Sequence, residues 1–312
     1  MYDAQLSNLI STALARLQSE MAGAAPVMTQ HVTRWMEHLA GSIPPEHYFK
    51  HPQAFPSLLL PWWLEKSLRE MPDLDFQADL VYSTINGYYA IRLADNLMDG
   101  HATVEYQLLP ALNFFQTEFQ AAYQPYFAAG HPFWDFFRAA WFHSAEVTLQ
   151  DALLTELDAV QFEQIAAQKT SAARIPLAAV CHHYGRTDRL EPWSRLVDLL
   201  GCWHQFLNDL FGWHRDYERR TTTYFLSEAE RRRRPNEPVL SWVAREGFGW
   251  GMAQAQGWMS ALQALAQELG SPELVSYLET REEMLQRQAT EASAGLVALR
   301  KLASVGKEWT AI

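Results

Sequence analysis

The chain has 312 residues, of which 48% are apolar, so it can bury a full hydrophobic core, which excludes a disordered chain, a disulfide-held miniprotein and a fibrous repeat. Acidic residues outnumber basic ones by 36 to 25, a net charge of -11, and this balance disfavours a nucleic-acid partner. Cys181 and Cys202, the two cysteines, lie in apolar stretches and cannot form a disulfide framework, so we expect a reducing, cytoplasmic compartment.

Apolar residues recur at intervals of three and four along most of the chain, the spacing of amphipathic helices, and no alternating run indicates a strand. We therefore predict an all-α fold. In chain order, the predicted helices cover residues 3–21, 27–40, 55–70, 75–99, 104–128, 132–151, 155–183 with a break near Pro176, 192–218, 237–247, 249–269 and 272–304. No break is long enough for a domain linker, so we expect one large helical bundle over residues 1–312.

Residues 1–21 have no basic leader and no uninterrupted apolar core, and we expect neither a signal peptide nor an anchor there. No later segment reaches the roughly 18 uncharged apolar residues that a membrane span needs. We therefore predict no stable membrane insertion.

The predicted helix over residues 75–99 ends with Asp95 and Asp99, and Gly100 follows at once. A separation of four residues is just over one helical turn, so both carboxylates lie on one face, at a helix end where the macrodipole disfavours negative charge. This pattern indicates a site for a cation. The alternative is a solvated pair of surface aspartates.

A second polar run follows in the predicted helix over residues 192–218. Asn208, Gly212 and Asp216 are spaced by four residues, which aligns an amide, a gap and a carboxylate on one stripe. Oxygen ligands of this kind suit magnesium, which keeps several waters and takes others from substrate phosphates. A stripe that faces solvent is the alternative reading.

These motifs resemble those of the class I isoprenoid synthases, the superfamily of trans-prenyl diphosphate synthases and terpene cyclases. DNLMD, from Asp95 to Asp99, is similar to the aspartate-rich motif DDxxD. NDLFGWHRD, from Asn208 to Asp216, is similar to the cyclases' second motif, (N/D)Dxx(S/T)xxxE. Lys169 with Thr170 resembles the Lys-Thr pair of the prenyl synthases, and Gln205 matches a glutamine before their second motif.

The resemblance implies three magnesium ions bound together with the substrate diphosphate. On this reading Asp95 and Asp99 bind two of the ions, and Asn208 and Asp216 bind the third. The resemblance also gives the fold: a single bundle of the class I isoprenoid synthase type.

The diphosphate of the substrate is expected to contact basic side chains, and we select Lys169, Arg215 and Arg219. The resemblance places the hydrocarbon pocket at the residues one to two turns before the first motif. Pocket residues are predicted to be Gly87, Tyr88, Ala90, Ile91 and His204. Because those just before the motif are mostly small, we expect a substrate of fifteen or twenty carbons.

Departures from the family pattern favour a cyclase over a chain-elongating enzyme. Prenyl synthases carry an arginine pair after the first motif, but residues 100–109 read GHATVEYQLL. In the upstream segment only Lys50 is retained. Gly212 and Asp216 also replace the usual Ser/Thr and Glu ligands of the second motif, and this departure motivates the reading as a non-catalytic homologue.

We therefore expect a magnesium-dependent class I terpene synthase, a lyase that ionises a linear prenyl diphosphate and cyclises or deprotonates the carbocation. Two alternatives stay open: a prenyl diphosphate synthase or other prenyltransferase, and a non-catalytic homologue that binds prenyl diphosphates. We also allow for a homodimer. Arg231–Arg234 are interpreted either as a lid over the diphosphate or as a solvated loop.

Overall fold

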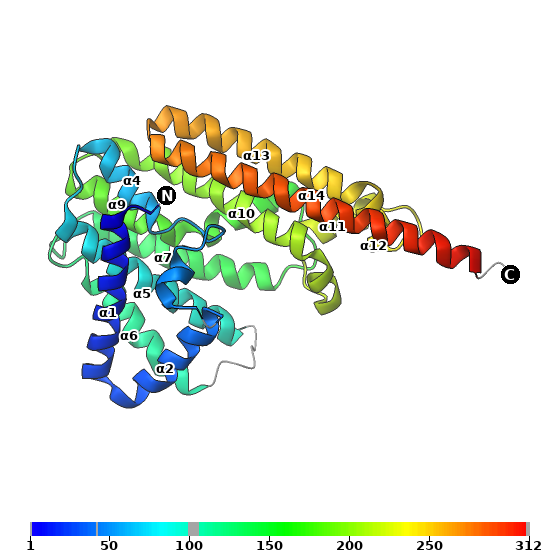
Figure 1. The fold of residues 1–312 in the computed structure, drawn as a ribbon. Coiled ribbons are helices and arrows are strands. Elements are labelled where there is room, and N and C mark those ends of the chain that lie inside the picture. Colours follow the sequence, from blue (N-terminus) through cyan, green and yellow to red (C-terminus); the bar gives the residue numbers. More distant parts are fainter. Residues whose placement is uncertain (1, 42, 99–105, 310–312) are drawn as a thin grey trace. The chain divides into compact units, whose positions relative to one another are not determined.

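The computed structural model describes residues 2–41, 43–98 and 106–309. In these ranges every regular element is a helix and no strand is present (Figure 1), so the all-α prediction is confirmed. None of the helices in the described part is both long enough and apolar enough to cross a membrane. The chain divides into two compact units, residues 1–142 with 172–194 and residues 143–171 with 195–312.

The first unit holds six helices of its own from the N-terminal half and one from the middle of the chain. They are α1 (Ala4–Ala24), α2 (Pro26–Leu39), α3 (Pro45–Phe49), α4 (Leu59–Leu68), α5 (Leu74–Met98), α6 (Leu109–Ala121) and α9 (Arg174–His183). Two helices, α7 (Phe133–Ala152) and α10 (Leu190–Arg219), contribute residues to both units.

Helix α5 packs against α1 and α6 in the core of the first unit. Its buried side chains continue around most of the helix, and Tyr89 makes edge and stacked contacts with Trp35 and Phe115, at ring-centroid distances of 5.7 and 5.5 Å. Aromatic side chains bury large areas and prefer such offset geometries. The high aromatic content of the sequence therefore serves core packing in this unit.

A buried carboxylate joins α4, α5 and α9. Glu65 is fully buried, and its oxygens accept hydrogen bonds of 2.6 Å from the backbone N–H of Asp73, from Gln77 Nε2 and from the Tyr184 hydroxyl. Arg69 adds an ion pair at 3.5 Å. Because a buried charge is tolerated only when donors replace its water, this set of donors fixes the ends of three helices together.

The second unit contains the C-terminal parts of α7 and α10 together with the further elements of residues 143–171 and 195–312. These are α8 (Ala159–Lys169), α11 (Tyr224–Arg232), α12 (Val239–Trp242), a π-helical turn (Val243–Gly247), α13 (Phe248–Leu269) and α14 (Pro272–Trp309). Helices α13 and α14 run side by side (Figure 1). Phe206 of α10 lies in an aromatic cluster with Phe162, Tyr224 and Trp258.

The predicted helix over 155–183 is two helices, and the break predicted near Pro176 lies a few residues earlier in the chain. The chain breaks between Lys169 and Arg174, where Ser171–Ala173 form a 3-10 turn. Pro176 lies in the first turn of α9, where a proline leaves no helical hydrogen bond unmade. The short helices α3 and α11 were not predicted, and the helix expected over 104–128 is α6, Leu109–Ala121, within the described residues.

Candidate functional site

Polar side chains line one face of α5 in the first unit. Tyr88, Arg92 and Asp95 follow one another at intervals of four and three residues, and Arg92 Nη1 donates to Asp95 Oδ2 over 2.9 Å. Tyr88 hydrogen-bonds Tyr48, and burial followed by the neighbouring Tyr48 raises the pKa of Tyr88 above its usual range. Asp95, the first residue of the predicted metal motif, thus has a cation as a neighbour on its own helix.

Asp99, the other predicted ligand of this motif, lies outside the described residues. Of the predicted pocket residues, Gly87 and Ala90 are buried, whereas Ile91 is exposed. A Cβ atom at Gly87 would lie 2.9 Å from the Phe119 ring, so this glycine allows α5 and α6 to approach closely. Their role in a pocket stays a prediction.

In the second unit, the Lys169–Thr170 pair lies against α10. A Cβ atom at the buried Gly201 would meet the Thr170 hydroxyl and would come within 2.9 Å of the Ala166 carbonyl oxygen. Cys202 Sγ also contacts the backbone oxygen of Glu163 at 3.3 Å. Gly201 of α10 therefore leaves space for the last turn of α8, and the two helices pack closely at this point.

The Lys169 side chain is held from α7. Its Nζ donates to Asp151 Oδ2 over 2.6 Å, and the Ser144 hydroxyl donates to the Lys169 backbone oxygen over 2.8 Å. Both charged side chains are partly exposed, at 30% and 26%. The ammonium group is thus held by α7 and remains partly exposed, so it is accessible to an anion.

Asp209 is the member of this region that the sequence interpretation did not select. It is 3% exposed, and Gln205 Nε2 donates to its Oδ1 over 2.9 Å. Burial, reinforced by the nearby Asp216 and Asp151 carboxylates, raises the pKa of Asp209 to about 7, although hydrogen bonds from Gln205 and the Tyr224 backbone oppose the shift. Its position within the Asn208–Asp216 motif was the available signal.

The end of the second motif is covered by its own arginine. Arg215 Nε lies 3.2 Å from Asp216 Oδ1, and a Cβ atom at Gly212 would lie 2.7 Å from Arg215 Nη2. The guanidinium therefore extends over the gap that Gly212 leaves. Asn208 and Arg219 are exposed.

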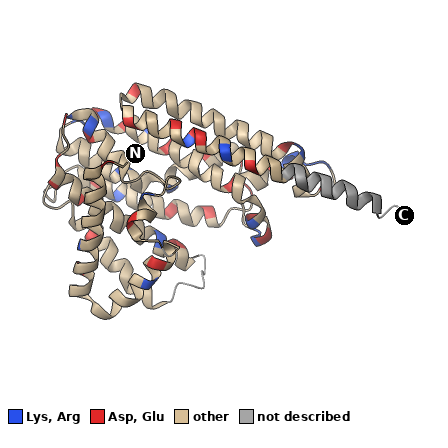
Figure 2. Ribbon diagram, viewed as in Figure 1, with Lys and Arg blue, Asp and Glu red and all other residues tan. Residues whose placement is uncertain are grey.

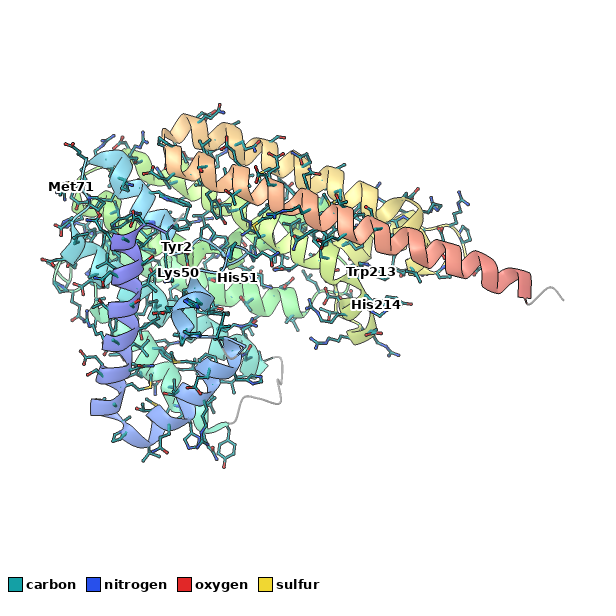
Figure 3. All side chains as sticks on the ribbon, viewed as in Figure 1. Tyr2, Lys50, His51, Met71, Trp213 and His214 are labelled. Atoms are coloured by element: carbon teal, nitrogen blue, oxygen red, sulfur yellow. The ribbon has the colours of Figure 1, made fainter. Side chains whose placement is uncertain are left out.

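His204 is half-buried on α10. Trp213 and His214 lie on the C-terminal part of the same helix, and Lys50 is the C-cap residue of α3 (Figure 3). Figure 2 shows acidic and basic residues dispersed along the helices of each unit.

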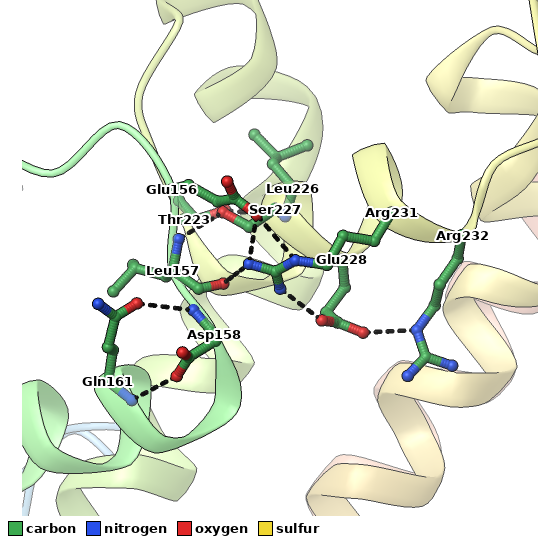
Figure 4. Close-up of polar contacts among 10 residues, drawn as sticks. All are labelled: Glu156, Leu157, Asp158, Gln161, Thr223, Leu226, Ser227, Glu228, Arg231 and Arg232. Atoms are coloured by element: carbon green, nitrogen blue, oxygen red, sulfur yellow. Dashed lines mark hydrogen bonds and ion pairs between the residues drawn. The ribbon is translucent and has the colours of Figure 1, made fainter.

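The arginine run at the end of α11 is engaged in ion pairs (Figure 4). Arg231 contacts Glu156, the Leu157 carbonyl and Glu228, and Arg232 contacts Glu228 at 2.5 Å. These contacts fasten α11 to the segment that precedes α8. In this structure Arg231 therefore connects α11 to the segment that precedes α8, and Arg232 pairs with Glu228 on its own helix. The first part of the run is helical and not a loop, and a lid over the diphosphate stays a prediction.

The donors at the two motifs fit magnesium in their chemistry. Asp95 and Asp216 offer carboxylate oxygens, at side-chain exposures of 34% and 13%, and Asn208 adds an amide oxygen. Among the described residues, no group of three or more His, Cys, Asp or Glu is placed to hold a metal ion unaided. Magnesium commonly binds one or two carboxylates and completes its octahedron with water and phosphate oxygens.

No protein-family model matches the chain, and no curated protein matches it in sequence.

Proposed function

We propose that this chain is a magnesium-dependent class I terpene synthase that ionises a linear prenyl diphosphate of fifteen or twenty carbons. The observation that supports the proposal is the group of charged side chains in the second unit, in which Lys169 pairs with Asp151, and Asp151 and Asp216 both act on the buried Asp209. The Lys169 ammonium pairs with Asp151, and the Asp151 and Asp216 carboxylates both act electrostatically on Asp209, so this region contains both signs of charge that a metal–diphosphate complex requires. The proposal includes the class I isoprenoid synthase fold and a cytoplasmic location.

In this mechanism Lys169, Arg215 and Arg219 bind the diphosphate oxygens of the substrate. Asp95, Asn208 and Asp216 are the described residues that would hold magnesium, which would neutralise the charge that develops on the leaving diphosphate. The carbon–oxygen bond breaks heterolytically, and the diphosphate leaves with the electron pair. The carbocation then loses a proton to solvent or to the released diphosphate, or it adds water and the resulting oxonium loses a proton in the same way.

Lys169 and two aromatic side chains also act in the same reaction. Lys169 exchanges its carboxylate partner, Asp151, for the substrate diphosphate, so its charge stays balanced before and after binding. We assign to Tyr88 and Trp213 the electrostatic stabilisation of the carbocation by an aromatic ring. No covalent protein nucleophile takes part.

Elongation is not part of the proposal. Joining a second prenyl unit requires two diphosphates close together, and several fixed cations must offset their repulsion. The sequence after the first motif, residues 100–109, contains no Lys or Arg. We therefore expect one diphosphate substrate.

The test is incubation with ten-, fifteen- and twenty-carbon prenyl diphosphates and magnesium, with measurement of released diphosphate and mass analysis of extracted hydrocarbons. We expect an apolar product from the fifteen- or twenty-carbon substrate, with no change when isopentenyl diphosphate is added. A product longer by five carbons identifies a prenyl diphosphate synthase instead. The absence of magnesium-dependent diphosphate release with all three substrates contradicts both enzymes and favours a binding protein.

The site variant for this test is Asp95→Asn, which keeps the size of the side chain and removes its charge. We expect turnover to fall at least on the order of a hundredfold while the fold persists, because the carboxylate acts on the leaving group and not in packing. Asp135→Asn is the matched control, since Asp135 is an exposed aspartate paired with an arginine on its own helix. Equal turnover in both variants contradicts the site.

A further inference from the structure

We infer that Arg92 is a resting counter-ion of Asp95 and sets the magnesium concentration at which Asp95 binds the metal. This inference rests on the proposed function, because it assigns Asp95 to a metal. It concerns a residue outside the motif, three positions before it on α5.

The contact between the two side chains carries the inference. Arg92 Nη1 lies 2.9 Å from Asp95 Oδ2, with the two side chains 39% and 34% exposed. A magnesium ion on this carboxylate would lie within a few ångströms of the guanidinium. Two cations at that range repel each other even in water. Arg92 must therefore move away, or metal binding to Asp95 is weakened.

The Arg92 side chain is incompletely satisfied where it lies. Its Nε is buried and has no hydrogen-bond partner among the described residues. The guanidinium has five N–H donors, so a place where one of them is buried and unused is not its most favourable position. The side chain therefore gains hydrogen bonds when it moves toward solvent or an anion.

The location of Asp95 explains why a counter-ion is present without metal. Asp95 lies near the last described residue of α5, Met98, and the partial negative charge at a helix C-terminus disfavours a carboxylate and favours a cation. The positive charge of Arg92 offsets the negative charge of Asp95 and the partial negative charge of the helix end. It stabilises the metal-free helix end and opposes the metal for the same electrostatic reason.

The chain contains a matched control for this pair. Arg138 and Asp135 on α7 have the same spacing, three residues, and a contact of 2.7 Å, with the aspartate preceding the arginine and both side chains more exposed. Arg138→Met changes the net charge of the protein by the same amount as Arg92→Met. It therefore reports any effect of overall charge on magnesium binding.

The experiment compares wild type, Arg92→Met, Arg92→Lys and Arg138→Met. Methionine keeps the apolar stem of the arginine and removes its charge. For each protein, magnesium is titrated in two assays: thermal stabilisation without substrate, and release of diphosphate from a prenyl diphosphate. Far-UV circular dichroism verifies the helical content of each variant.

We expect Arg92→Met to lower the magnesium midpoint by roughly three- to tenfold. Arg92→Lys and Arg138→Met should stay near the wild-type midpoint. We also expect the metal-free Arg92→Met protein to unfold at a lower temperature than wild type, and magnesium to remove that difference.

An unchanged or higher midpoint in Arg92→Met, in whichever assay responds in wild type, overturns the inference and leaves the proposed function intact. If wild type responds to magnesium in neither assay, the proposed function fails, and the inference fails with it. The wild-type titration thus distinguishes the two failures.

Discussion

Glu65 in the first unit and Asp209 in the second are both buried carboxylates on helices, but they have different neighbours. Glu65 accepts hydrogen bonds from three elements and pairs with Arg69. Asp209 receives bonds from Gln205 and the Tyr224 backbone while Asp216 and Asp151 repel its charge. A buried carboxylate that is surrounded by hydrogen-bond donors stabilises the fold. A buried carboxylate with other carboxylates nearby lowers the stability of the fold, and such groups are concentrated at functional sites.

The largest effect is expected from removing the stabilising carboxylate. Glu65→Ala leaves the buried amide of Gln77 and the partly buried donors of Tyr184 and the Asp73 backbone without their acceptor, and we expect it to lower the free energy of unfolding by about 3–5 kcal/mol. Urea unfolding measures this change. Glu70→Ala, at an exposed glutamate nearby, should cost under about 0.5 kcal/mol. Similar losses in both variants would contradict the role given to Glu65.

The opposite sign is expected at Asp209. Its folded pKa of about 7 lies above the usual 3.8, so its contribution to stability is complete below about pH 3.8 and is lost as the pH rises through 7. Asp209→Asn should therefore raise the free energy of unfolding by about 1–3 kcal/mol at pH 8 and by less at pH 5. We also expect turnover to fall.

The control for that comparison is Asp135→Asn, at an exposed aspartate, which should change stability little at either pH. Urea unfolding at pH 5 and pH 8 gives the two differences. A stability gain that does not depend on pH, or a loss at pH 8, would show that Asp209 is not held as a destabilised carboxylate.

A smaller effect is expected from Lys169, whose ammonium neutralises Asp151 next to Asp209. Lys169→Met leaves Asp151 without its partner, and the pKa of Asp209 should move further upward because the repulsion grows. For a partly exposed pair we expect stability at pH 8 to fall by about 0.5–1 kcal/mol. The pH dependence of unfolding in Lys169→Met and Lys169→Arg measures both effects, and identical profiles would exclude the coupling.

The helical class could be predicted from the sequence because apolar residues recur at intervals of three and four along most of the chain. The positions of helix breaks that depend on tertiary contacts were predicted less well. The chain breaks at Ser171–Ala173, after Thr170 meets Gly201, whereas Pro176, a breaker by local rules, fits the first turn of α9. Helix α11 was missed because the threonines and arginines around it favour a loop locally. Its stability comes from contacts such as those of Arg231 with Glu156 and Glu228.

Residue spacing could place Asn208, Gly212 and Asp216 on one stripe, since that follows from helical geometry alone. It could not distinguish the buried Asp209 from its exposed neighbour Asn208, because burial depends on what α10 packs against. Nor could it pair Lys169 with Asp151 across two helices. The sequence thus supplies candidate side chains, and their environments come only from the folded unit.

The smallest effect is expected at Gly212, which tests the functional side of the comparison. A Cβ atom there would lie 2.7 Å from Arg215 Nη2, the end of a flexible side chain that can move aside, so Gly212→Ala should gain about 0.5–1 kcal/mol from helix propensity. Gly201→Ala is the contrast, since its Cβ would press on the backbone oxygen of Ala166 and should destabilise the protein.

Gly212→Ser adds a hydroxyl ligand, and we expect this variant, unlike Gly212→Ala, to lower the magnesium midpoint of diphosphate release as well. Equal midpoints in the Ala and Ser variants would mean that no metal binds at this position.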